Sequence, residues 1–403
     1  MASTLVVPVV ELKRVRTHPN ADKLELCDVL GYQLCILKGM HKTGDLGVYF
    51  PADTLLPKEW AEKFGVVSLL KGAQKDRVGK IALRGEPSFG LFVPIPEGLT
   101  CKLGDNVAEF FGAKKYEPPV RATCGDPAGY DSTIDPYIQK YTDIQNGRIF
   151  TDIFQPDESI VATEKIHGTN CKIGFIRVYD IHNSTLLLGS PGPGATTKYY
   201  RHVAGSMELR RKWPMRVIQP KNFFEKIIRK IWGDKKEKIA LEDMGSNTYW
   251  HPWSLLPVRS LMAHVIDTFN NIGMAAHSVL LYGEVYGGAI NFDYGIPNGK
   301  GLGFKVFDLS IDGKYMDFDA FAELCDKFGV QRVPVLYRGP FKDFDAKFAD
   351  GPSTIEGAKN IREGVVIKPL VERTDPKVGR ACCKIIGTQY ALGLRDTEDN
   401  KDI

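Results

Sequence analysis

The stretch covering residues 160–178 constrains the fold more than any other part of the chain. Apolar residues alternate with others at positions 160–163 and again at 171–178, a two-residue period that is typical of β-strands. Between these segments, Gly168 and small polar residues allow the backbone to turn tightly. The pattern therefore predicts two strands that meet at a corner, with Lys165 at that corner.

Lys165 is the first candidate catalytic residue. A lysine amine that points into a cleft becomes a nucleophile once it loses its proton, which nearby cations or desolvation promote. The alternative is an exposed lysine in an ordinary surface turn. The short pattern K-x-x-G does not decide between the two, so the decision depends on motifs elsewhere in the chain.

Residues 4–112 consist of short apolar segments separated by turn residues. Strand-like segments lie at 6–15, 27–36, 46–50, 80–83 and 90–93, and a brief helix is expected at 60–64. Short strands at this spacing predict a small β-barrel. Prolines and glycines are frequent over residues 118–136, and we place the domain junction there.

The composition excludes several classes of protein. The 403 residues are enough for two or three domains, and 43% apolar with 25% charged residues is ordinary for a globular protein. No apolar run is long enough to span a bilayer, and the first residues lack the pattern of a secretory signal. Eight cysteines without a C-x-x-C pair favour neither a zinc site nor a disulfide framework. We expect a cytoplasmic monomer that does not contact membranes.

Positive charge is concentrated in one region. The whole chain has a formal net charge of +4, but residues 198–238 contain thirteen Lys/Arg against four Asp/Glu, a local balance of +9. Paired apolar residues between 223 and 232 give this region the pattern of an amphipathic helix. Two interpretations of this basic region remain: its side chains contact phosphates, or they form an ordinary solvated face of a helix.

Residues 164–170 read Glu-Lys-Ile-His-Gly-Thr-Asn. This heptapeptide resembles the signature of ATP-dependent RNA ligases in the covalent nucleotidyltransferase superfamily, in which the lysine becomes adenylated. DNA ligases and capping enzymes usually have Asp-Gly where this chain has His-Gly. The resemblance implies that Lys165 is the nucleophile, that Glu164 and Ile166 contact ATP, and that Asn170 organises metal-bound water.

Later segments resemble the remaining family motifs in the same order. Glu284, at the end of a buried strand, corresponds to the glutamate that binds the ATP ribose, and a carboxylate suits a hydroxyl donor. Phe307 corresponds to the aromatic residue that stacks on adenine. As an isolated strand aromatic, Phe307 would more often be a core residue.

The fourth motif resembles residues 362–368, Arg-Glu-Gly-Val-Val-Ile-Lys. Strand alternation would place Glu363 and Val365 on one face, with Glu363 helping to hold a divalent ion and Val365 covering the second face of adenine. Lys368 is also expected to contact ATP.

The fifth motif resembles residues 381–386. There Lys384 would contact the α-phosphate, with Cys382 where many relatives have a second lysine. Arg148 is the candidate for an arginine that holds ATP phosphates before the lysine strand; an ordinary surface arginine is the alternative.

The barrel precedes the motifs, and residues 18–25 resemble the opening of OB domains in tRNA-binding modules. This order resembles nick-sealing RNA ligases known from Deinococcus and Naegleria. The implied fold class is α+β: an OB-type barrel over residues 1–122, then a nucleotidyltransferase domain of antiparallel sheets with flanking helices over 123–403. A basic helical insertion is expected near 198–275.

The resemblance implies an enzyme that uses ATP and Mg²⁺ or Mn²⁺ to join RNA ends or seal nicked duplexes through lysyl-AMP. Two alternatives remain open at this point. One is an OB-type RNA- or tRNA-binding protein whose transferase domain has lost activity. The other is a DNA ligase or a capping-type nucleotidyltransferase.

Overall fold

The computed structural model describes residues 5–116, 130–131, 138, 140–177, 200–207, 210–217, 236–272, 276–287, 292–296, 301–391 and 393. The chain forms two compact units, each built from separate segments. The first comprises Met1–Val120, Asp143–Gln155 and Asp375–Leu394, and the second comprises Arg121–Thr142, Pro156–Thr374 and Arg395–Ile403. The first segment thus ends near the expected boundary at 122, and two later segments join it.

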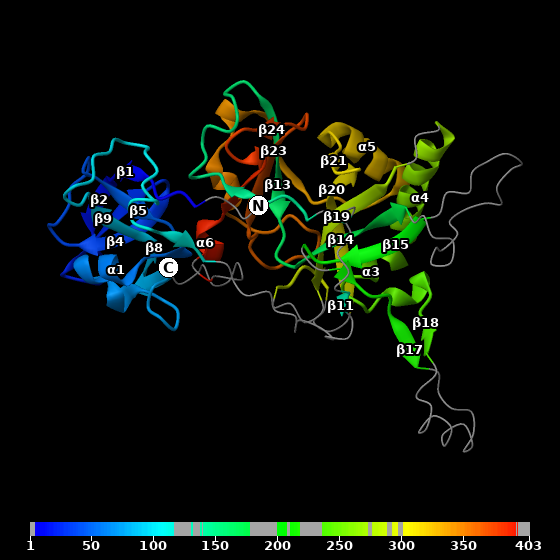
Figure 1. The fold of residues 1–403 in the computed structure, drawn as a ribbon, viewed down its shortest axis with the longest axis horizontal. Coiled ribbons are helices and arrows are strands. Elements are labelled where there is room, and N and C mark those ends of the chain that lie inside the picture. Colours follow the sequence, from blue (N-terminus) through cyan, green and yellow to red (C-terminus); the bar gives the residue numbers. More distant parts are fainter. Residues whose placement is uncertain are drawn as a thin grey trace, which may run out of the picture. The chain divides into compact units, whose positions relative to one another are not determined.

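The first unit consists mainly of short strands (Figure 1). Its elements are β1 (Val9–Glu11), β2 (Lys13–Thr17), β3 (Leu24–Val29), β4 (Tyr32–Leu37), β5 (Leu46–Phe50), β6 (Thr54–Leu55), α1 (Lys58–Lys63), η1 (Val67–Leu69), β7 (Lys80–Leu83), β8 (Glu86–Phe89), β9 (Leu91–Pro94), β10 (Lys114–Lys115), β12 (Gln145–Asn146), β25 (Gly379–Arg380), β26 (Cys383–Ile386) and α6 (Thr388–Ala391). Antiparallel sheets have the orders β1-β5-β9, β2-β3-β4, β6-β10 and β7-β8, and β12 pairs in parallel with β26.

The single strand expected over residues 27–36 is wrong, because this segment contains a turn. Leu30 and Gly31 both have positive φ, at 50° and 76°, and join β3 to β4 as a two-residue hairpin. Such loops match the right-handed twist of paired strands. Apolar residues on both sides of the turn conceal it in the sequence, and Gly31 is its only local signal.

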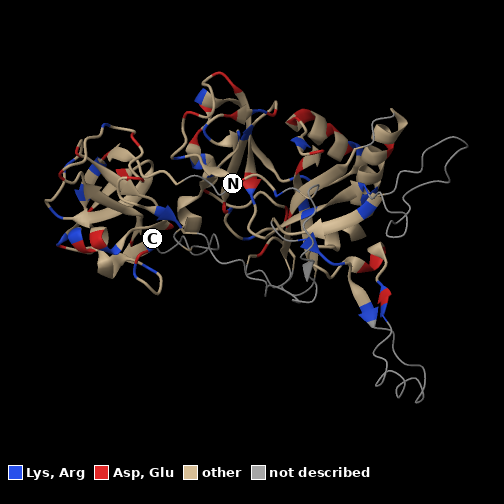
Figure 2. Cartoon of the chain, viewed as in Figure 1, with Lys and Arg blue, Asp and Glu red and all other residues tan. Residues whose placement is uncertain are grey.

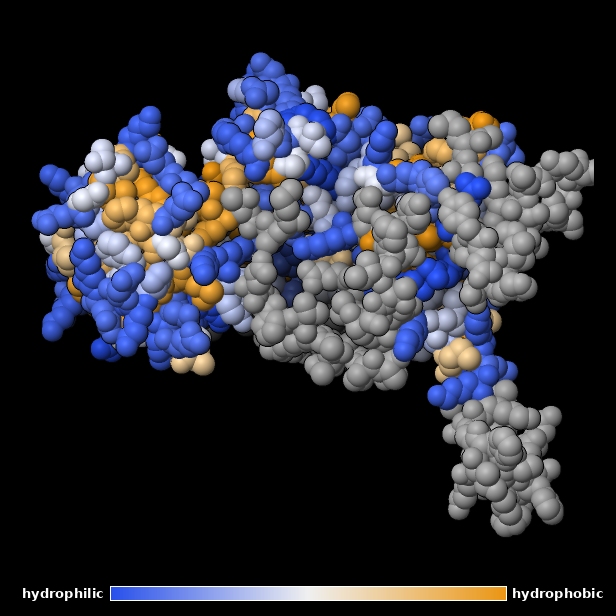
Figure 3. Space-filling view, viewed as in Figure 1, coloured by the Kyte–Doolittle hydropathy of each residue, from blue (hydrophilic) through white to orange (hydrophobic). Residues whose placement is uncertain are grey.

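Two apolar clusters stabilise the first unit. Val48 and Phe50 of β5 point into one cluster, and Tyr49, between them, points into the other. The alternation of a strand explains this division, because successive side chains lie on opposite faces. Apolar side chains also reach the surface of the unit (Figure 3), among them Leu37 and Met40.

The second unit is built on larger sheets. Its elements are β11 (Tyr130–Asp131), β13 (Ser159–Lys165), β14 (Thr169–Arg177), β15 (Tyr200–Gly205), β16 (Arg210–Arg211), β17 (Met215–Val217), β18 (Lys236–Lys238), η4 (Leu241–Met244), α3 (His251–Ser254), α4 (Leu256–Asn271), β19 (Ser278–Gly287), β20 (Leu302–Ile311), β21 (Lys314–Tyr315), α5 (Phe318–Phe328), β22 (Val335–Pro340), η5 (Phe341–Asp343), η6 (Ala346–Ala349) and β23 (Gly364–Pro369), while β24 (Thr374–Asp375) lies at its end. The expected strands before and after Lys165 are confirmed as β13 and β14.

Strands β13 and β14 belong to different sheets, so Lys165 lies where the chain passes from one sheet to the other. The large sheet has the order β11-β16-β15-β14-β19-β20-β21, and β13 pairs antiparallel with β22 on one side and β23 on the other. Helix α4 buries Leu261, Met262 and Val265 against one face of the large sheet. The opposite face carries the row of Asn170, Glu284 and Lys305.

The insertion expected near 198–275 is not simply helical. Its described part contributes β15 and β16 to the large sheet, then the hairpin of β17 and β18, then α3 and α4. Basic residues are visible on the hairpin (Figure 2), where Arg216 pairs with Glu237. The helix expected at 223–232 lies outside the described residues. No helix in the described part of the chain is long and apolar enough to cross a membrane.

The burial of His202 leads to a prediction about the stability of the fold at acidic pH. Its ring is buried between Phe175 and Trp253, with ring centroids 4.9 and 4.7 Å away, and burial lowers the pKa of His202 from 6.5 to about 4. A depressed pKa means that the unfolded chain binds the proton more readily than the folded chain. The contribution of neutral His202 to the free energy of unfolding is therefore fully present above pH 6.5 and is lost as the pH falls toward 4.

The variant His202→Phe removes this proton site and keeps an aromatic ring. Wild type is expected to lose about 2 kcal/mol more than the variant between pH 7 and pH 5. Denaturant unfolding at both pH values measures the difference. Equal pH dependence of the two proteins would show that His202 titrates normally.

Candidate active site

Lys165, the last residue of β13, forms an ion pair with Glu363. Its Nζ lies 2.7 Å from Glu363 Oε1, and the two side chains are 24% and 13% exposed. Burial opposes the charge of Glu363, but Lys165 and His167 outweigh it, so the pKa of Glu363 lies below its usual value. The predicted nucleophile therefore points at a charged carboxylate and is partly shielded from water.

A second carboxylate, Glu284, faces the same place from the large sheet. The register pairs Asn170 of β14, Glu284 of β19 and Lys305 of β20 in one row, so their side chains share a face. Burial raises the pKa of Glu284 to about 8, and Glu363 adds to this effect, while Lys165 opposes it. Glu284 therefore holds a proton at pH 7 until a further cation approaches.

Gly168 allows the corner to lie directly on β19. A Cβ built there would lie 2.4 Å from the carbonyl oxygen of Val285 and 2.9 Å from Glu284 Cγ. The Gly168 amide also donates to the Glu284 carboxyl group. The glycine is needed for this close approach of two backbones.

The variant Gly168→Ala is expected to force β14 and β19 apart at this point. Overpacking of this kind typically lowers stability by about 1–3 kcal/mol and would separate Glu284 from Lys165. Thermal melting and labelling by α-labelled ATP measure the two effects. Gly245→Ala is the control, because its new Cβ would meet only Ser254 Oγ at 3.7 Å. Similar behaviour of the two variants would contradict the packing argument.

His167 shapes the turn after Lys165. Its backbone N–H donates to the hydroxyl of Tyr294 at 2.7 Å, and its ring lies 4.3 Å from that of Phe292. His167 Nδ1 also lies 3.7 Å from Glu363 Oε2. The histidine thus contacts the carboxylate that binds Lys165, and Tyr294 and Phe292 are site residues that the sequence motifs did not reveal.

The expectation that Glu164 contacts ATP is not supported by the geometry. Glu164 is 1% exposed and lies on the face of β13 opposite Lys165. Ser353 Oγ donates to one carboxylate oxygen at 2.5 Å, and the amide and hydroxyl of Thr354 donate to the other at 2.7 and 2.6 Å. Glu164 is therefore an anchor for residues 353–354. Ile166, also expected to contact ATP, is buried in an apolar cluster.

The prediction that Val365 covers adenine is wrong in register. Val365 pairs with Glu164 across the sheet and is fully buried, whereas Val366 pairs with Thr163 and lies on the face of Lys165. Glu363 precedes β23, so strand alternation does not place it with Val365. Val366 is the better candidate for a contact with the nucleotide.

Lys368 is an internal ion-pair partner, which corrects its expected contact with ATP. Its Nζ donates to the carbonyl of Phe307 at 2.9 Å and pairs with Asp308, and Tyr141 donates to the same carboxylate. The side chains of Lys368 and Asp308 are 5% and 2% exposed. This buried group fixes β20 at Phe307, whose half-buried ring lies 5.1 Å from that of Tyr141.

Arg362 holds the segment before Glu363. It is 9% exposed and donates to the carbonyls of Phe348 and Pro352 at 2.8–3.1 Å. Its place next to Glu363 was visible in the sequence, but its carbonyl partners were not, because they are set by the fold of the preceding loop.

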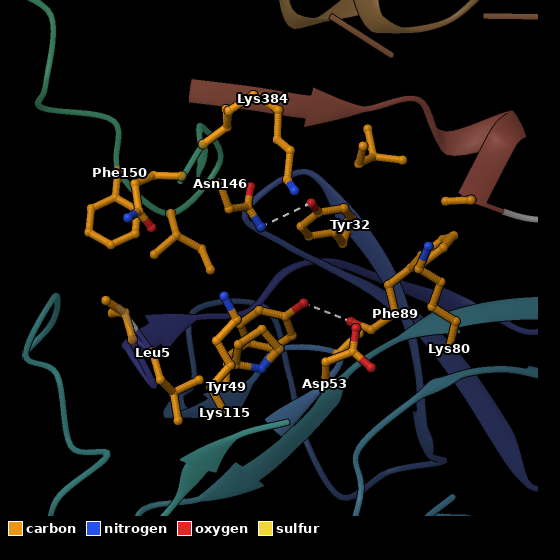
Figure 4. A pocket seen from close by; sticks show the side chains of 18 residues that line it. Leu5, Tyr32, Tyr49, Asp53, Lys80, Phe89, Lys115, Asn146, Phe150 and Lys384 are labelled. Atoms are coloured by element: carbon orange, nitrogen blue, oxygen red, sulfur yellow. Dashed lines mark hydrogen bonds between the residues drawn. The ribbon is translucent and has the colours of Figure 1, made fainter. Parts of the chain in front are cut away.

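Arg148 and Lys384 belong to the first unit. The guanidinium of Arg148 lies over the ring of Tyr32, 4.9 Å from its centroid, and donates to the carbonyl of Gly31 at 3.4 Å. Lys384 lies on β26 and lines a cavity of that unit (Figure 4), with Cys382 buried two residues earlier.

Oxygen atoms near Lys165 suit a hydrated divalent cation. Asn170 Oδ1 is buried without a hydrogen-bond partner among the described residues, and the carboxyl groups of Glu284 and Glu363 surround the same lysine. No group of three or more His, Cys, Asp or Glu residues in the described ranges forms a complete metal site. A cation that retains most of its water, as Mg²⁺ does, fits this donor set.

Comparison with known proteins supports one family. Residues 158–386 match the family model described as RNA ligase, and residues 6–95 match an OB-fold domain. No curated protein matches the chain. Among solved structures, a mutant Naegleria gruberi RNA ligase without ligand is 20% identical, with a TM-score of 0.58 and 100% of both chains covered.

Two further structures of the Naegleria gruberi enzyme are similar to the same degree. One contains pyrophosphate (20% identity, TM-score 0.56), and the other is a mutant with ATP and Mn (21% identity, TM-score 0.55); each covers 99% of both chains. At this identity the similarity establishes the fold, an OB domain joined to mostly antiparallel sheets.

Proposed function

Since this chain belongs to the RNA ligase family, we propose that it joins RNA 3′-hydroxyl and 5′-phosphate ends with ATP, through a lysyl-AMP intermediate, at nicks in duplexes. The observation that carries the proposal is the 2.7 Å ion pair between Lys165 and Glu363, with Glu284 and Asn170 beside it. The similar Naegleria gruberi enzyme was solved with ATP and Mn, which supports the same substrate and metal here.

Lys165 performs the first step in this proposal. Its amine must first lose a proton, which nearby cations promote, and its lone pair then attacks the α-phosphorus of ATP. A nitrogen–phosphorus bond forms as the bond to pyrophosphate breaks. Charge gathers on the nonbridging oxygens during this transfer, so cations near Lys165 lower the barrier.

Mg²⁺ or Mn²⁺ would be held by Glu363, partly through water, and by Asn170. The ion would supply positive charge at the phosphate, and its approach would favour the ionised form of Glu284. Ionised Glu284 is then a stronger acceptor for a ribose hydroxyl. Phe307 and Val366 are the proposed adenine contacts, and Lys384 is the proposed contact of the α-phosphate.

The remaining steps transfer AMP to RNA. An RNA 5′-phosphate oxygen attacks the phosphorus of lysyl-AMP and releases the Lys165 amine. The neighbouring 3′-hydroxyl then attacks the RNA 5′-phosphorus, AMP leaves, and the strand is sealed.

The cysteines in the described part of the chain are free thiols, which suits the reducing cytoplasm that we propose as the location of the protein.

Nicked duplexes with RNA or DNA on each side of the break test the proposal. We expect an acid-stable label on the protein from α-labelled ATP and sealing that requires RNA at the nick. An inactive RNA-binding protein would bind the duplexes without taking up label. A DNA ligase would seal all-DNA nicks as well, and a capping-type enzyme would take label from GTP instead.

A further inference from the structure

The hairpin of β17 and β18 is a part of the second unit that the family motifs do not account for. It follows β16 in the chain and projects from the body of the unit (Figure 1). Strand β16 pairs with β15, and β15 pairs with β14, which begins soon after the Lys165 corner. The hairpin is therefore connected to the sheet that carries Asn170 and Glu284, at a strand two positions from β14.

Two tryptophans fix the base of this hairpin. Trp213 Nε1 donates to the carbonyl of Ile239 at 2.9 Å, and Trp250 Nε1 donates to the carbonyl of Lys212 at 2.9 Å. The ring centroids of Trp213 and Trp250 are 4.8 Å apart, and that of Trp213 lies 5.8 Å from that of His202. Since an isolated two-stranded hairpin is marginally stable in water, these contacts to the buried core are needed to hold it in place.

The two faces of the hairpin differ in charge. Arg216 and Glu237 pair across the strands, with Arg216 Nη2 2.8 Å from Glu237 Oε1, so the charges on their face compensate each other. Strand alternation places Lys236 and Lys238 on the other face, where Met215 is paired with Lys238. Both lysines are exposed, and the described part of the hairpin has no carboxylate on this face. We call the face formed by Met215, Lys236 and Lys238 the basic face.

The surroundings leave this positive charge uncompensated. Lys212, which is exposed just before β17, adds a further cation. The exposed carboxylates that follow the hairpin, Glu242 and Asp243, lie on η4, and Glu242 pairs with Arg259 at 3.5 Å. Lysines can protect an exposed hairpin from pairing with other strands, or they can contact a polyanion. The separation of both lysines from the compensated pair favours the polyanion.

We propose that the basic face contacts the sugar-phosphate backbone of the RNA duplex outside the nick. Lysine ammonium groups bind phosphate as point charges, and each contact releases counterions from the nucleic acid. Residues two positions apart on a strand are about 6.7 Å apart, so Lys236 and Lys238 can contact separate phosphates. This inference rests on the function proposed above, because it takes the nicked duplex as the substrate.

The test compares Lys236→Gln/Lys238→Gln with Lys314→Gln/Lys347→Gln. The control pair removes two exposed lysines of the same unit, one from β21 at the far edge of the large sheet and one from η6. Binding of a nicked RNA duplex is measured over a range of salt concentrations, and sealing is measured over a range of duplex concentrations. Lys236→Arg/Lys238→Arg keeps the charge, and melting curves verify that every variant folds.

The glutamine variant of the basic face should bind the duplex about tenfold more weakly, and the slope of log K against log salt should fall by about 1 for each lysine lost. Its KM for the nicked duplex should rise while kcat stays near that of wild type, because the lysines lie outside the reacting atoms. The arginine variant should restore both properties. Labelling by α-labelled ATP requires no RNA and should proceed at the wild-type rate in every variant.

Basic-face and control variants that bind and seal the duplex alike would overturn this inference. That result would assign the two lysines to protection of the hairpin edges or to a protein partner. It is distinct from failure of the proposed function, because wild type would still take up label from ATP and seal nicks. A wild-type protein that takes up no label would instead contradict the ligase proposal itself.

Discussion

Replacing Lys165 with alanine is expected to reduce labelling by α-labelled ATP to background. The reaction needs a primary amine at this corner, and alanine supplies no nucleophile. The fold should survive, because the Lys165 side chain is 24% exposed and its ion-pair partner Glu363 retains access to water at 13% exposure. Gel-based labelling with thermal melting measures both properties.

Lys165→Arg is the matched control for this result. Arginine keeps the positive charge and can pair with Glu363, but its guanidinium does not lose a proton in proteins and cannot attack phosphorus. This variant should melt like wild type and still take up no label. Label on either variant would identify another residue as the nucleophile.

Replacing Glu363 with glutamine is expected to slow labelling by about 10²-fold or more, the size of effect seen when one electrostatic contact to a transition state is removed. The change preserves shape and removes the charge that orients Lys165 at 2.7 Å. It also removes a proposed ligand of the divalent ion. Single-turnover labelling over a range of Mg²⁺ and Mn²⁺ concentrations measures the effect. Removal of the divalent ion by a chelator should abolish labelling of the wild-type protein.

Glu356→Gln makes the same chemical change at an exposed position and should label at the wild-type rate. The pKa of Glu363 lies below its usual value, so the difference between the two variants should persist throughout the neutral pH range. A Glu363→Gln protein that labels within twofold of wild type at every metal concentration would exclude the proposed role.

The strands around Lys165 were predictable because each has a clear two-residue period bounded by turn residues. The expected segments at 160–163 and 171–178 lie within or largely within β13 and β14. The hairpin at Leu30 and Gly31 was missed because apolar residues continue through it. Periodicity reports which residues are buried and does not report where a strand turns back.

The side-chain roles that the sequence could not provide depend on register and on distant partners. Val365 and Val366 are adjacent, and only the pairing with β13 shows that Val366 lies on the face of Lys165. The sequence suggests that Lys368 binds a ligand, but in the fold its ammonium group forms a buried ion pair with Asp308, sixty residues away. Motif order locates a site, and the fold decides which residues of each motif face it.

Residues 348–354 are attached to both members of the central ion pair through the residues that precede them. Glu164 is bound to Ser353 and Thr354, and Arg362 is bound to the carbonyls of Phe348 and Pro352. The same loop therefore holds both the strand end that carries Lys165 and the segment that carries Glu363. A displacement of this loop is expected to move the two residues in the same direction. Substitutions in residues 348–354 should therefore change the direction in which the Lys165 amine points more readily than they change the distance between this amine and the Glu363 carboxylate.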